Sequence, residues 1–449
     1  MSKVAELIAR SRVAQKQFEH ATQEQADAAA KAILKVIYDN AEKLGPMAAE
    51  ETRIGDPINK IAKCRNKSSL IWHCIKDRPS VDIINRIPEK KMIEVAKPMG
   101  VVASIVPSTN PIVTPMSNAA FALKTRNSII FSPHPRAVEC TKLVVELFRA
   151  ELKKLGFPED LVLGLEAGTI EDGDELMRGC DITVATGGMD MVKAAYSSGK
   201  PALGVGAGNV QVIVDTDYDL NKAAADIILG RAFDNGLICL GEQTVFVHED
   251  QLEDFKAALN ANGGFFVEDG EILREGLYPG GGRMNGELLG RTALQVAEKL
   301  GIEVPAETRV LYTMAKGLGA EDVLCREKMC PVITVATYKT FEEGVAGMLA
   351  NLEHEGKGHS VGVHSNTPAH VEYAGIMCPV SRVIINQPTG TTGGGSPTNG
   401  FGATTTLGCG SWGNNSFSGN FDFVHLMNIS RIGYPYEESY LPSPEMAWE

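Results

Sequence analysis

Residues 181–198 have the sequence DITVATGGMDMVKAAYSS. The short apolar run at the start is rich in β-branched residues and predicts a strand over Asp181–Ala185. The turn Thr186-Gly187-Gly188 follows directly, and the amphipathic segment after it predicts a helix over Met189–Ser198. A strand that runs through a glycine turn into a helix is typical of parallel α/β sheets. Such a turn can admit a phosphate to a helix N-terminus, although the tripeptide alone is better explained as an ordinary strand-to-helix turn.

The alternation of strands and helices continues on both sides of this stretch. Helices predicted over Pro135–Leu155 and Asp217–Arg231 separate strand candidates that recur every ~20–30 residues. This pattern predicts right-handed crossovers and a parallel, doubly wound sheet, in which ligands bind beyond the carboxyl ends of the strands. The other strand candidates of this sheet are Val101–Val106, Ser128–Ser132, Leu161–Leu163, Val210–Val214 and Thr244–Val247. A second α/β pattern follows Cys239, with strand candidates Val310–Tyr312, Val332–Thr337 and Val361–His364.

The two ends of the chain predict a different structure. Residues 1–75 are expected to be helical, with long amphipathic runs such as Gln23–Leu44. Residues 81–96 predict a β-hairpin with a charged turn, and a hairpin between helices must pair with another sheet or another subunit. Residues 434–449 contain Pro435, Pro442 and Pro444 and are expected to be extended. The hairpin and the tail together predict a homo-oligomer, either a dimer or a tetramer.

The composition restricts the class of protein. A chain of 449 residues is too long for one hydrophobic core, so two or three domains are expected. The formal net charge of −13 argues against nucleic acid as the main partner. No apolar stretch is long enough to predict a membrane span. The nine cysteines are scattered, which predicts no disulfide framework, no zinc or other metal site, and a reducing cytoplasmic setting.

Cys239 lies in the segment DNGLICLGEQ of residues 234–243, between a predicted helix and a predicted strand. Gly236 ends the helix, so the thiol is presented on irregular backbone that two regular elements hold in place. A thiol in this position could attack a carbonyl carbon. An isolated cysteine is more often a small buried core residue, and that is the better explanation for Cys330 and Cys409.

Residues 389–413 are rich in glycine. A flexible linker is one explanation. Threonine, asparagine, cysteine and tryptophan are interleaved with the glycines, however, and this mixture favours an ordered loop next to a ligand.

Several of these segments, taken in order along the chain, resemble motifs of the aldehyde dehydrogenase superfamily and specifically of its CoA-acylating branch. The resemblance covers essentially the whole chain. It implies an aldehyde dehydrogenase-like α/β fold with a doubly wound nucleotide-binding domain over residues 1–235, which includes the hairpin. An α/β catalytic domain over residues 236–413 and a C-terminal oligomerisation segment over residues 414–449 complete the expected organisation, in which hairpin and tail form a small β oligomerisation element.

The resemblance also implies roles for individual residues. Cys239 would be the nucleophile, and the Asn110 amide with the Cys239 N–H would form the oxyanion hole. His359 matches a histidine of the acylating branch and could deprotonate CoA, although a structural histidine is an equal alternative. Glu242 is better explained as a structural hydrogen-bonding residue than as a general base. The expected contacts to NAD or NADP are Ser132, Pro133 and His134 at the adenosine, Thr186, Gly187 and Gly188 at the phosphates, Gly206, and Glu327 at the nicotinamide ribose.

One motif of the hydrolytic members of the superfamily is missing. These enzymes carry a glutamate that activates water, and the matching segment here, Leu203–Asn209, contains no carboxylate. Water attacks a thioester poorly without a general base, so the thiol of coenzyme A is expected to accept the acyl group. A hydrolytic aldehyde dehydrogenase is therefore an alternative that this segment argues against.

The sequence motifs indicate the type of reaction more narrowly than they indicate the aldehyde substrate. Residues 192–201 and 407–416 most resemble the CoA-acylating succinate-semialdehyde dehydrogenases. Leu240, where that group usually has a small residue, and Pro397 depart from its pattern, so sulfoacetaldehyde and acetaldehyde remain alternatives.

Several basic residues could bind an anionic substrate tail, and the sequence does not select among them. A catalytically silent scaffold on the same fold is the last alternative. The presence of Asn110, Cys239 and Glu327 argues against it. The basic candidates are Arg126, Arg382 and Lys193.

Overall fold

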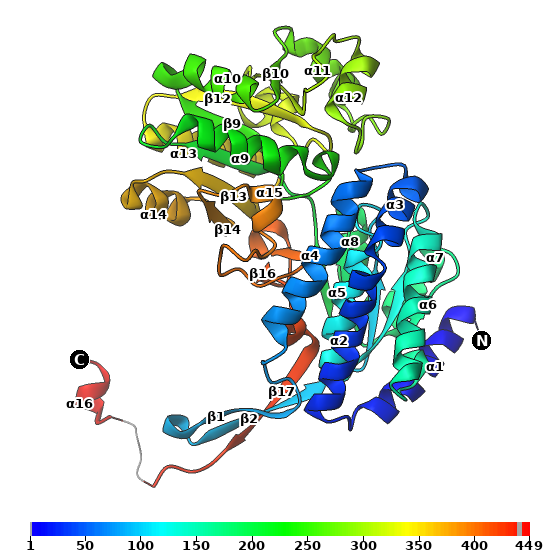
Figure 1. The fold of residues 1–449 in the computed structure, drawn as a ribbon. Helices are drawn as coiled ribbons and strands as arrows, with labels where there is room; N and C mark the ends of the chain where they lie inside the picture. Colours follow the sequence, from blue (N-terminus) through cyan, green and yellow to red (C-terminus); the bar gives the residue numbers. More distant parts are fainter. Residues whose placement is uncertain (1, 438–441) are drawn as a thin grey trace.

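The computed structural model describes residues 2–437 and 442–449. It contains two parallel β-sheets covered by helices and a small antiparallel sheet that projects away from them (Figure 1). The expected α/β class with a separate β element is therefore confirmed.

The first parallel sheet has five strands in the order β5-β4-β3-β6-β7. Strands β3 and β4 are buried along their whole length, which explains why their sequences are apolar throughout rather than alternating. The strand order changes direction between β3 and β6, the place where ligands of doubly wound sheets bind. The strands are β3 (Val101–Ile105), β4 (Ser128–Ser132), β5 (Val162–Gly164), β6 (Ile182–Thr186) and β7 (Ala202–Val205).

Helices cover both faces of this sheet. Apolar residues of α2 to α6 form one large core with one face, and α1, α7 and α8 pack on the other. The helices are α1 (Lys3–Phe18), α2 (Gln23–Asp39), α3 (Ala41–Thr52), α4 (Pro57–Ile75), α5 (Val113–Lys124), α6 (Val138–Lys154), α7 (Ile170–Gly179) and α8 (Met189–Tyr196).

Two predicted helix boundaries in this region were wrong. The run Gln23–Leu44 is divided at Asn40, whose side-chain amide donates to the Val36 carbonyl oxygen at 2.7 Å and so ends α2. The helix expected from Pro135 begins only at Val138, because the Arg136 N–H donates to Nδ1 of His134 and holds the preceding residues in a turn.

The second parallel sheet has seven strands in the order β10-β11-β12-β9-β8-β13-β14. Sequence alternation alone placed β8 and β9 in the first sheet, but both belong to the second. Val210 of β8 pairs with Glu242 of β9, so residues 210–214 lie in the second sheet although they were expected in the domain of residues 1–235. The strands are β8 (Val210–Val214), β9 (Glu242–His248), β10 (Gly264–Phe266), β11 (Val310–Met314), β12 (Val332–Tyr338), β13 (Gly358–His364) and β14 (Val380–Ile385).

The helices of this second lobe bury both faces of its sheet. A further core lies under α11 and α12 at the edge of the sheet. The helices are α9 (Leu220–Ala232), α10 (Leu252–Ala261), α11 (Gly270–Leu277), α12 (Ala293–Leu300), α13 (Phe341–His354), α14 (Pro368–Met377) and α15 (Thr389–Thr392).

The antiparallel sheet consists of β1 (Asp82–Ile87), β2 (Met92–Pro98) and β17 (Met427–Gly433) in the order β1-β2-β17. The predicted hairpin is therefore confirmed, and the C-terminal segment adds a third strand to it. The tail is not extended throughout, because Ser443 caps a short helix, α16 (Pro444–Ala447). Residues 438–441 of the expected extended tail lie outside the described residues.

A two-stranded sheet, β15 (Leu407–Cys409) and β16 (Ser418–Asn420), joins the lobes near the cavity described below. Within residues 2–437 and 442–449, no helix is both long and apolar enough to cross a membrane.

Candidate active site

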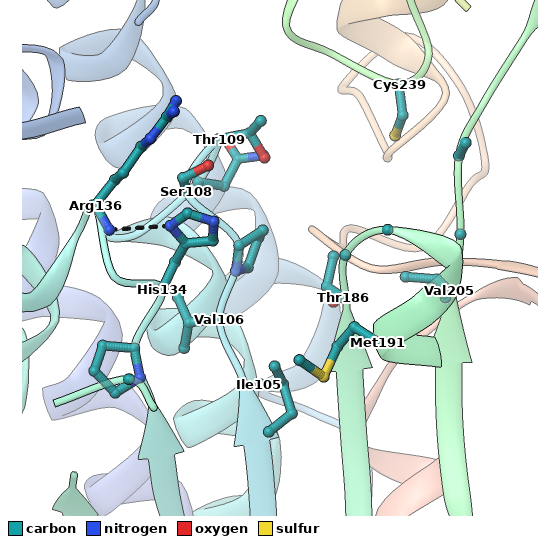
Figure 2. Close-up of a pocket in the computed structure, with 18 of the residues that line it drawn as sticks. Ile105, Val106, Ser108, Thr109, His134, Arg136, Thr186, Met191, Val205 and Cys239 are labelled. Carbon is teal, nitrogen blue, oxygen red and sulfur yellow. Dashed lines mark hydrogen bonds between the residues drawn. The ribbon is translucent and has the colours of Figure 1, made fainter. Parts of the chain in front are cut away.

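A cavity of about 650 Å³ lies between the two lobes, beyond the carboxyl ends of the strands of the first sheet. Figure 2 shows its two walls, with Thr186 and Met191 on one side, His134 and Arg136 on the other, and Cys239 above them. The structure brings together the residues that were expected to carry out catalysis and to bind the nucleotide. These are Asn110, Ser132, Pro133, His134, Thr186, Gly187, Gly188, Gly206, Cys239, Glu327 and His359.

Cys239 is presented by a loop of unusual backbone conformation. Asp234 and Asn235 have φ angles of 49° and 54°, and Gly236 has a φ angle of 72°. Positive φ at two successive residues with side chains is unfavourable and persists only where the surroundings enforce it. Here the Asn235 amide donates to the Gly290 carbonyl oxygen at 3.1 Å. A Cβ atom at Gly236 would lie 2.6 Å from the backbone of Cys330, so this position requires glycine.

The environment of the Cys239 thiol favours its neutral form. Burial, and secondarily the Glu327 carboxylate, raise the pKa of Cys239 to about 12. The thiolate is the nucleophilic form of cysteine, so this thiol would have to lose its proton before it could attack a carbonyl carbon. Within the described chain, the Cys239 N–H donates to no backbone carbonyl, which leaves it free to bind an oxyanion.

Asn110 lies between β3 and α5 and lines the cavity together with Cys239. Its Oδ1 accepts a hydrogen bond from Nζ of Lys63 at 2.7 Å. Its backbone carbonyl accepts the N–H of Thr114 in the first turn of α5. These contacts fix both the backbone and the side chain of Asn110.

His359 is fully buried on β13, and neither of its ring nitrogens has a hydrogen-bonding partner among the described residues. Burial, and secondarily the charge of Arg382, hold the pKa of His359 well below its usual value. The imidazole is therefore neutral, with one nitrogen able to accept a proton. Arg382 donates to the His359 carbonyl oxygen at 2.9 Å and fixes the strand that carries the ring.

Glu327 lies on the second lobe at the edge of the cavity. Its Oε1 accepts the Gly208 N–H at 3.3 Å, and the Tyr278 hydroxyl donates to its backbone carbonyl at 2.5 Å. Burial, and secondarily the Glu355 carboxylate, raise the pKa of Glu327 to about 8. A carboxyl group that is protonated near neutral pH can both donate to and accept from a sugar hydroxyl.

The glycine turn Thr186-Gly187-Gly188 ends β6 and precedes α8, as the sequence predicted. The α8 N-cap is Gly188, and no side chain caps this helix end. Free N–H groups at a helix N-terminus suit a phosphate. Ser132, at the end of β4 on the far side of β3, and His134 line the same cavity, so the residues are compatible with a dinucleotide that runs across the sheet edge.

A second cavity, of about 170 Å³, adjoins the first at Asn110, Cys239 and Leu407. Lys67 of α4 lines it, and its Nζ donates only to the Gly394 and Gly395 carbonyl oxygens. No carboxylate of the described chain pairs with this ammonium group. Burial, and secondarily the charge of Lys63, lower the pKa of Lys67 to about 8.

Lys67 was missed in the sequence, although a signal for it exists. Lys60, Lys63 and Lys67 are spaced so that they lie on one face of a helix. A charged face of this kind normally lies in water, so its burial would indicate a partner for the lysines inside the protein.

None of the three basic candidates named from the sequence lines either cavity. Arg126 pairs with Asp82 at 3.0 Å beside the hairpin, and Lys193 is exposed on α8. Arg382 donates to Ser360, His359 and Gly408 within the fold, where it joins β13 to β14 and β15.

The glycine-rich segment packs against the loop that carries Cys239. The Thr389 hydroxyl donates to the Leu240 carbonyl oxygen at 2.6 Å, and the Thr389 N–H donates to Glu242 at 2.7 Å. Gly393 allows this approach, since a Cβ atom there would lie 2.8 Å from the Leu240 side chain. The expectation of an ordered loop rather than a linker is confirmed. Glu242 lines neither cavity.

Comparison with known proteins gives concordant matches. The model of a family described as the aldehyde dehydrogenase family matches residues 1–263. A succinate-semialdehyde dehydrogenase (acetylating) of Clostridium kluyveri is 50% identical over 448 residues, which cover 99% of this chain and 98% of that protein.

Two solved structures illustrate the structural match. An acetylating aldehyde dehydrogenase of Geobacillus thermoglucosidasius superposes with a TM-score of 0.93 at 34% identity, over 98% of each chain. A propionaldehyde dehydrogenase of Rhodopseudomonas palustris, solved with bound propionyl-CoA, superposes with a TM-score of 0.84 at 27% identity, over 97% of this chain and 94% of that chain.

Proposed function

This chain belongs to the aldehyde dehydrogenase family and is a CoA-acylating member of it, and we propose that its aldehyde is succinate semialdehyde. The reaction would convert this aldehyde, CoA and NAD or NADP reversibly into succinyl-CoA and the reduced nucleotide. The observation that carries the choice of substrate is the half-buried ammonium group of Lys67 in the cavity next to Cys239, which no carboxylate of the described chain pairs with.

The geometry supports a covalent route through Cys239. Cys239 loses its proton to solvent, and its thiolate sulfur bonds to the aldehyde carbon as the C=O π bond opens. The resulting oxyanion accepts hydrogen bonds from Nδ2 of Asn110 and the Cys239 N–H. A bound nicotinamide supplies the hydride acceptor that turns this adduct into a thioester. Ser132, the turn Thr186-Gly187-Gly188 and Glu327 would hold the nucleotide, at the positions the cavity gives them.

The second half of the reaction passes the acyl group to CoA. The CoA thiolate attacks the thioester carbonyl and expels the thiolate of Cys239. His359 would accept the proton of the CoA thiol, since its imidazole is neutral and unpartnered. The strand end and loop of residues 203–209 offer no carboxylate that could activate water instead.

Succinate semialdehyde fits the charge of the second cavity. A carboxylate at the end of a short chain could reach Lys67 while its aldehyde carbon lies at Cys239, and the pair would replace the two carbonyl contacts of the ammonium by a charge-assisted bond. Sulfoacetaldehyde is the second candidate, because its sulfonate is an anion that could bind the same ammonium group. Acetaldehyde has no anionic tail and would leave Lys67 without a role.

Steady-state reduction of NAD and NADP by the purified protein tests this proposal, with succinate semialdehyde, sulfoacetaldehyde and acetaldehyde each assayed with and without CoA. We expect strict CoA dependence, complete loss of activity in Cys239→Ala, and the highest kcat/KM for succinate semialdehyde. Equal turnover without CoA would contradict the acylating step. A higher kcat/KM for acetaldehyde would contradict the role given to Lys67.

We also propose that the chain is a homo-oligomer, a dimer or a tetramer. Among the described residues, no strand pairs with either edge of the β1-β2-β17 sheet, and its strands carry exposed apolar residues, Ile83 at 44% and Ile432 at 44% exposure. Exposed edges and apolar side chains of this kind suit pairing with a second copy. Light scattering after size exclusion tests this, and a monomeric mass at assay concentration would contradict it.

A further inference from the structure

The ammonium group of Lys63 bridges the carboxylate of Asp234 and the amide of Asn110. Asp234 belongs to the loop of residues 234–241 that carries Cys239, which we call the nucleophile loop. Its Nζ lies 2.7 Å from Oδ1 of Asn110 and forms an ion pair with Oδ2 of Asp234. The side chain of Asp234 is fully buried and that of Lys63 is 8% exposed. A contact this well shielded from water persists far better than a surface ion pair.

This contact decides which way the amide of Asn110 faces. A lysine ammonium has three donors and no acceptor, so the atom that faces it must be the amide oxygen. The Nδ2 group therefore points away from Lys63. It makes no hydrogen bond within the described chain, and Asn110 lines both cavities beside Cys239.

The same carboxylate is anchored to the start of α4 and to the loop of Cys239. Oδ1 of Asp234 accepts the Asp56 N–H at 2.8 Å, and Lys60 donates to Oδ2 at 3.2 Å. Asp234 itself has a φ angle of 49° in the segment that leads to Cys239. A single buried carboxylate thus fixes the nucleophile loop on one side and, through Lys63, the amide on the other.

We propose that Lys63 is a positioning residue that holds the Asn110 amide with its N–H groups toward the oxyanion. This inference rests on the proposed function, because it needs a tetrahedral adduct at Cys239. Lys63 does not touch the reacting atoms and acts through Asn110. Without it the amide can turn over, and its oxygen would then repel the oxyanion. Loss of one oxyanion donor typically slows catalysis ~10²–10³-fold.

A double-mutant cycle tests this role. Lys63→Met keeps most of the length of the side chain and removes its donors, and Asn110→Ala removes the amide. We expect Lys63→Met alone to lower kcat for nucleotide reduction ~10–100-fold with a change in KM below ~3-fold. In the Asn110→Ala background the same substitution should lower kcat by less than ~3-fold, because the group through which it acts is already gone. Equal losses in both backgrounds would overturn the proposal.

Lys60→Met is the matched control. Lys60 binds the same carboxylate but makes no bond to the Asn110 side chain, and it donates instead to the Thr109 carbonyl oxygen at 3.4 Å. We expect this variant to lose thermal stability about as much as Lys63→Met while its kcat stays within ~3-fold of the wild type. Equal kcat losses in the two variants would show that Lys63 only supports the fold, and would overturn the proposal.

Acetaldehyde separates this role from binding of the substrate tail, because Lys63 also lines the second cavity. A positioning residue lowers kcat with acetaldehyde and with succinate semialdehyde alike. A loss confined to KM for succinate semialdehyde would overturn the proposal. Lack of CoA-dependent turnover by the wild type would instead refute the proposed function, so the two failures are distinguishable.

Discussion

The carboxylate of Glu242 accepts a hydrogen bond from the backbone N–H of Thr389 at 2.7 Å. This contact joins the first residue of β9, just after the Cys239 loop, to the glycine-rich segment that closes the second cavity. Oε2 of the same carboxylate has no partner among the described residues. Burial therefore dominates, and it raises the pKa of Glu242 to about 7.

Glu242→Gln is expected to stabilise the protein at alkaline pH. The folded state binds the proton more tightly than the unfolded state, whose pKa is near 4.5. The stabilising contribution of the neutral carboxyl is complete below pH 4.5 and is lost as the pH rises through about 7. Glutamine stays neutral at every pH, so the variant should have a free energy of unfolding that is up to ~3 kcal/mol larger than that of the wild type at pH 8.

Thermal melts of the wild type and the variant at pH 5 and pH 8 measure this difference. The gain in Tm should be larger at pH 8. The same difference at both pH values would show that Glu242 does not titrate in this range.

Alkylation of Cys239 by iodoacetamide should accelerate about tenfold for each pH unit between pH 7 and 9 in the absence of ligands. The pKa of about 12 means that the reactive thiolate is a small fraction that grows with pH throughout this interval. Mass spectrometry of the modified peptide follows the rate, and Cys239→Ala gives the background from the other cysteines. A plateau near pH 8 would mean that a nearby base already ionises the thiol in the empty site.

The part of the site that follows from local pattern could be predicted from the sequence. Ser132 and Thr186 are strand ends of one parallel sheet, so their convergence follows once the alternation of strands and helices is recognised. The sheet to which β8 belongs could not be predicted, because it depends on the pairing of Val210 with Glu242 across the chain. Lys67 was missed because the spacing of the lysines shows that they share one face of α4, but not that this face lies toward Cys239.

Lys67→Met is expected to raise KM for succinate semialdehyde ~10–100-fold and to leave KM for acetaldehyde within ~3-fold, because only the first has a carboxylate to bind the lost ammonium. Lys193→Met is the matched control, since Lys193 is exposed and lines neither cavity. Steady-state kinetics of both variants with both aldehydes decide the matter. An equal change in KM for the two aldehydes would contradict recognition of the tail by Lys67.

The charge of Lys67 also predicts a pH dependence. Its pKa of about 8 means that the ammonium form dominates below pH 8 and declines above it. The ratio of KM for succinate semialdehyde to KM for acetaldehyde should therefore rise between pH 7 and pH 9 in the wild type. The ratio should be constant in Lys67→Met. A wild-type ratio that does not change with pH would show that Lys67 does not titrate between pH 7 and pH 9.

His359→Ala is expected to separate the two halves of the reaction. Formation of the thioester at Cys239 does not use the imidazole, so a stopped-flow burst of reduced nucleotide should remain, close to one per site. Transfer to CoA should slow ~10²–10⁴-fold, the usual contribution of a general base, and steady-state turnover should fall with it.

His364→Ala is the matched control for this variant, because His364 is buried on the same strand but lines neither cavity. Its burst and its steady-state rate should fall together, if at all, through loss of folded protein. Equal slowing of burst and turnover in His359→Ala would mean that the imidazole supports the site as a whole rather than CoA deprotonation. A selective loss of the CoA step would distinguish a base from a structural histidine, the two roles between which the sequence could not decide.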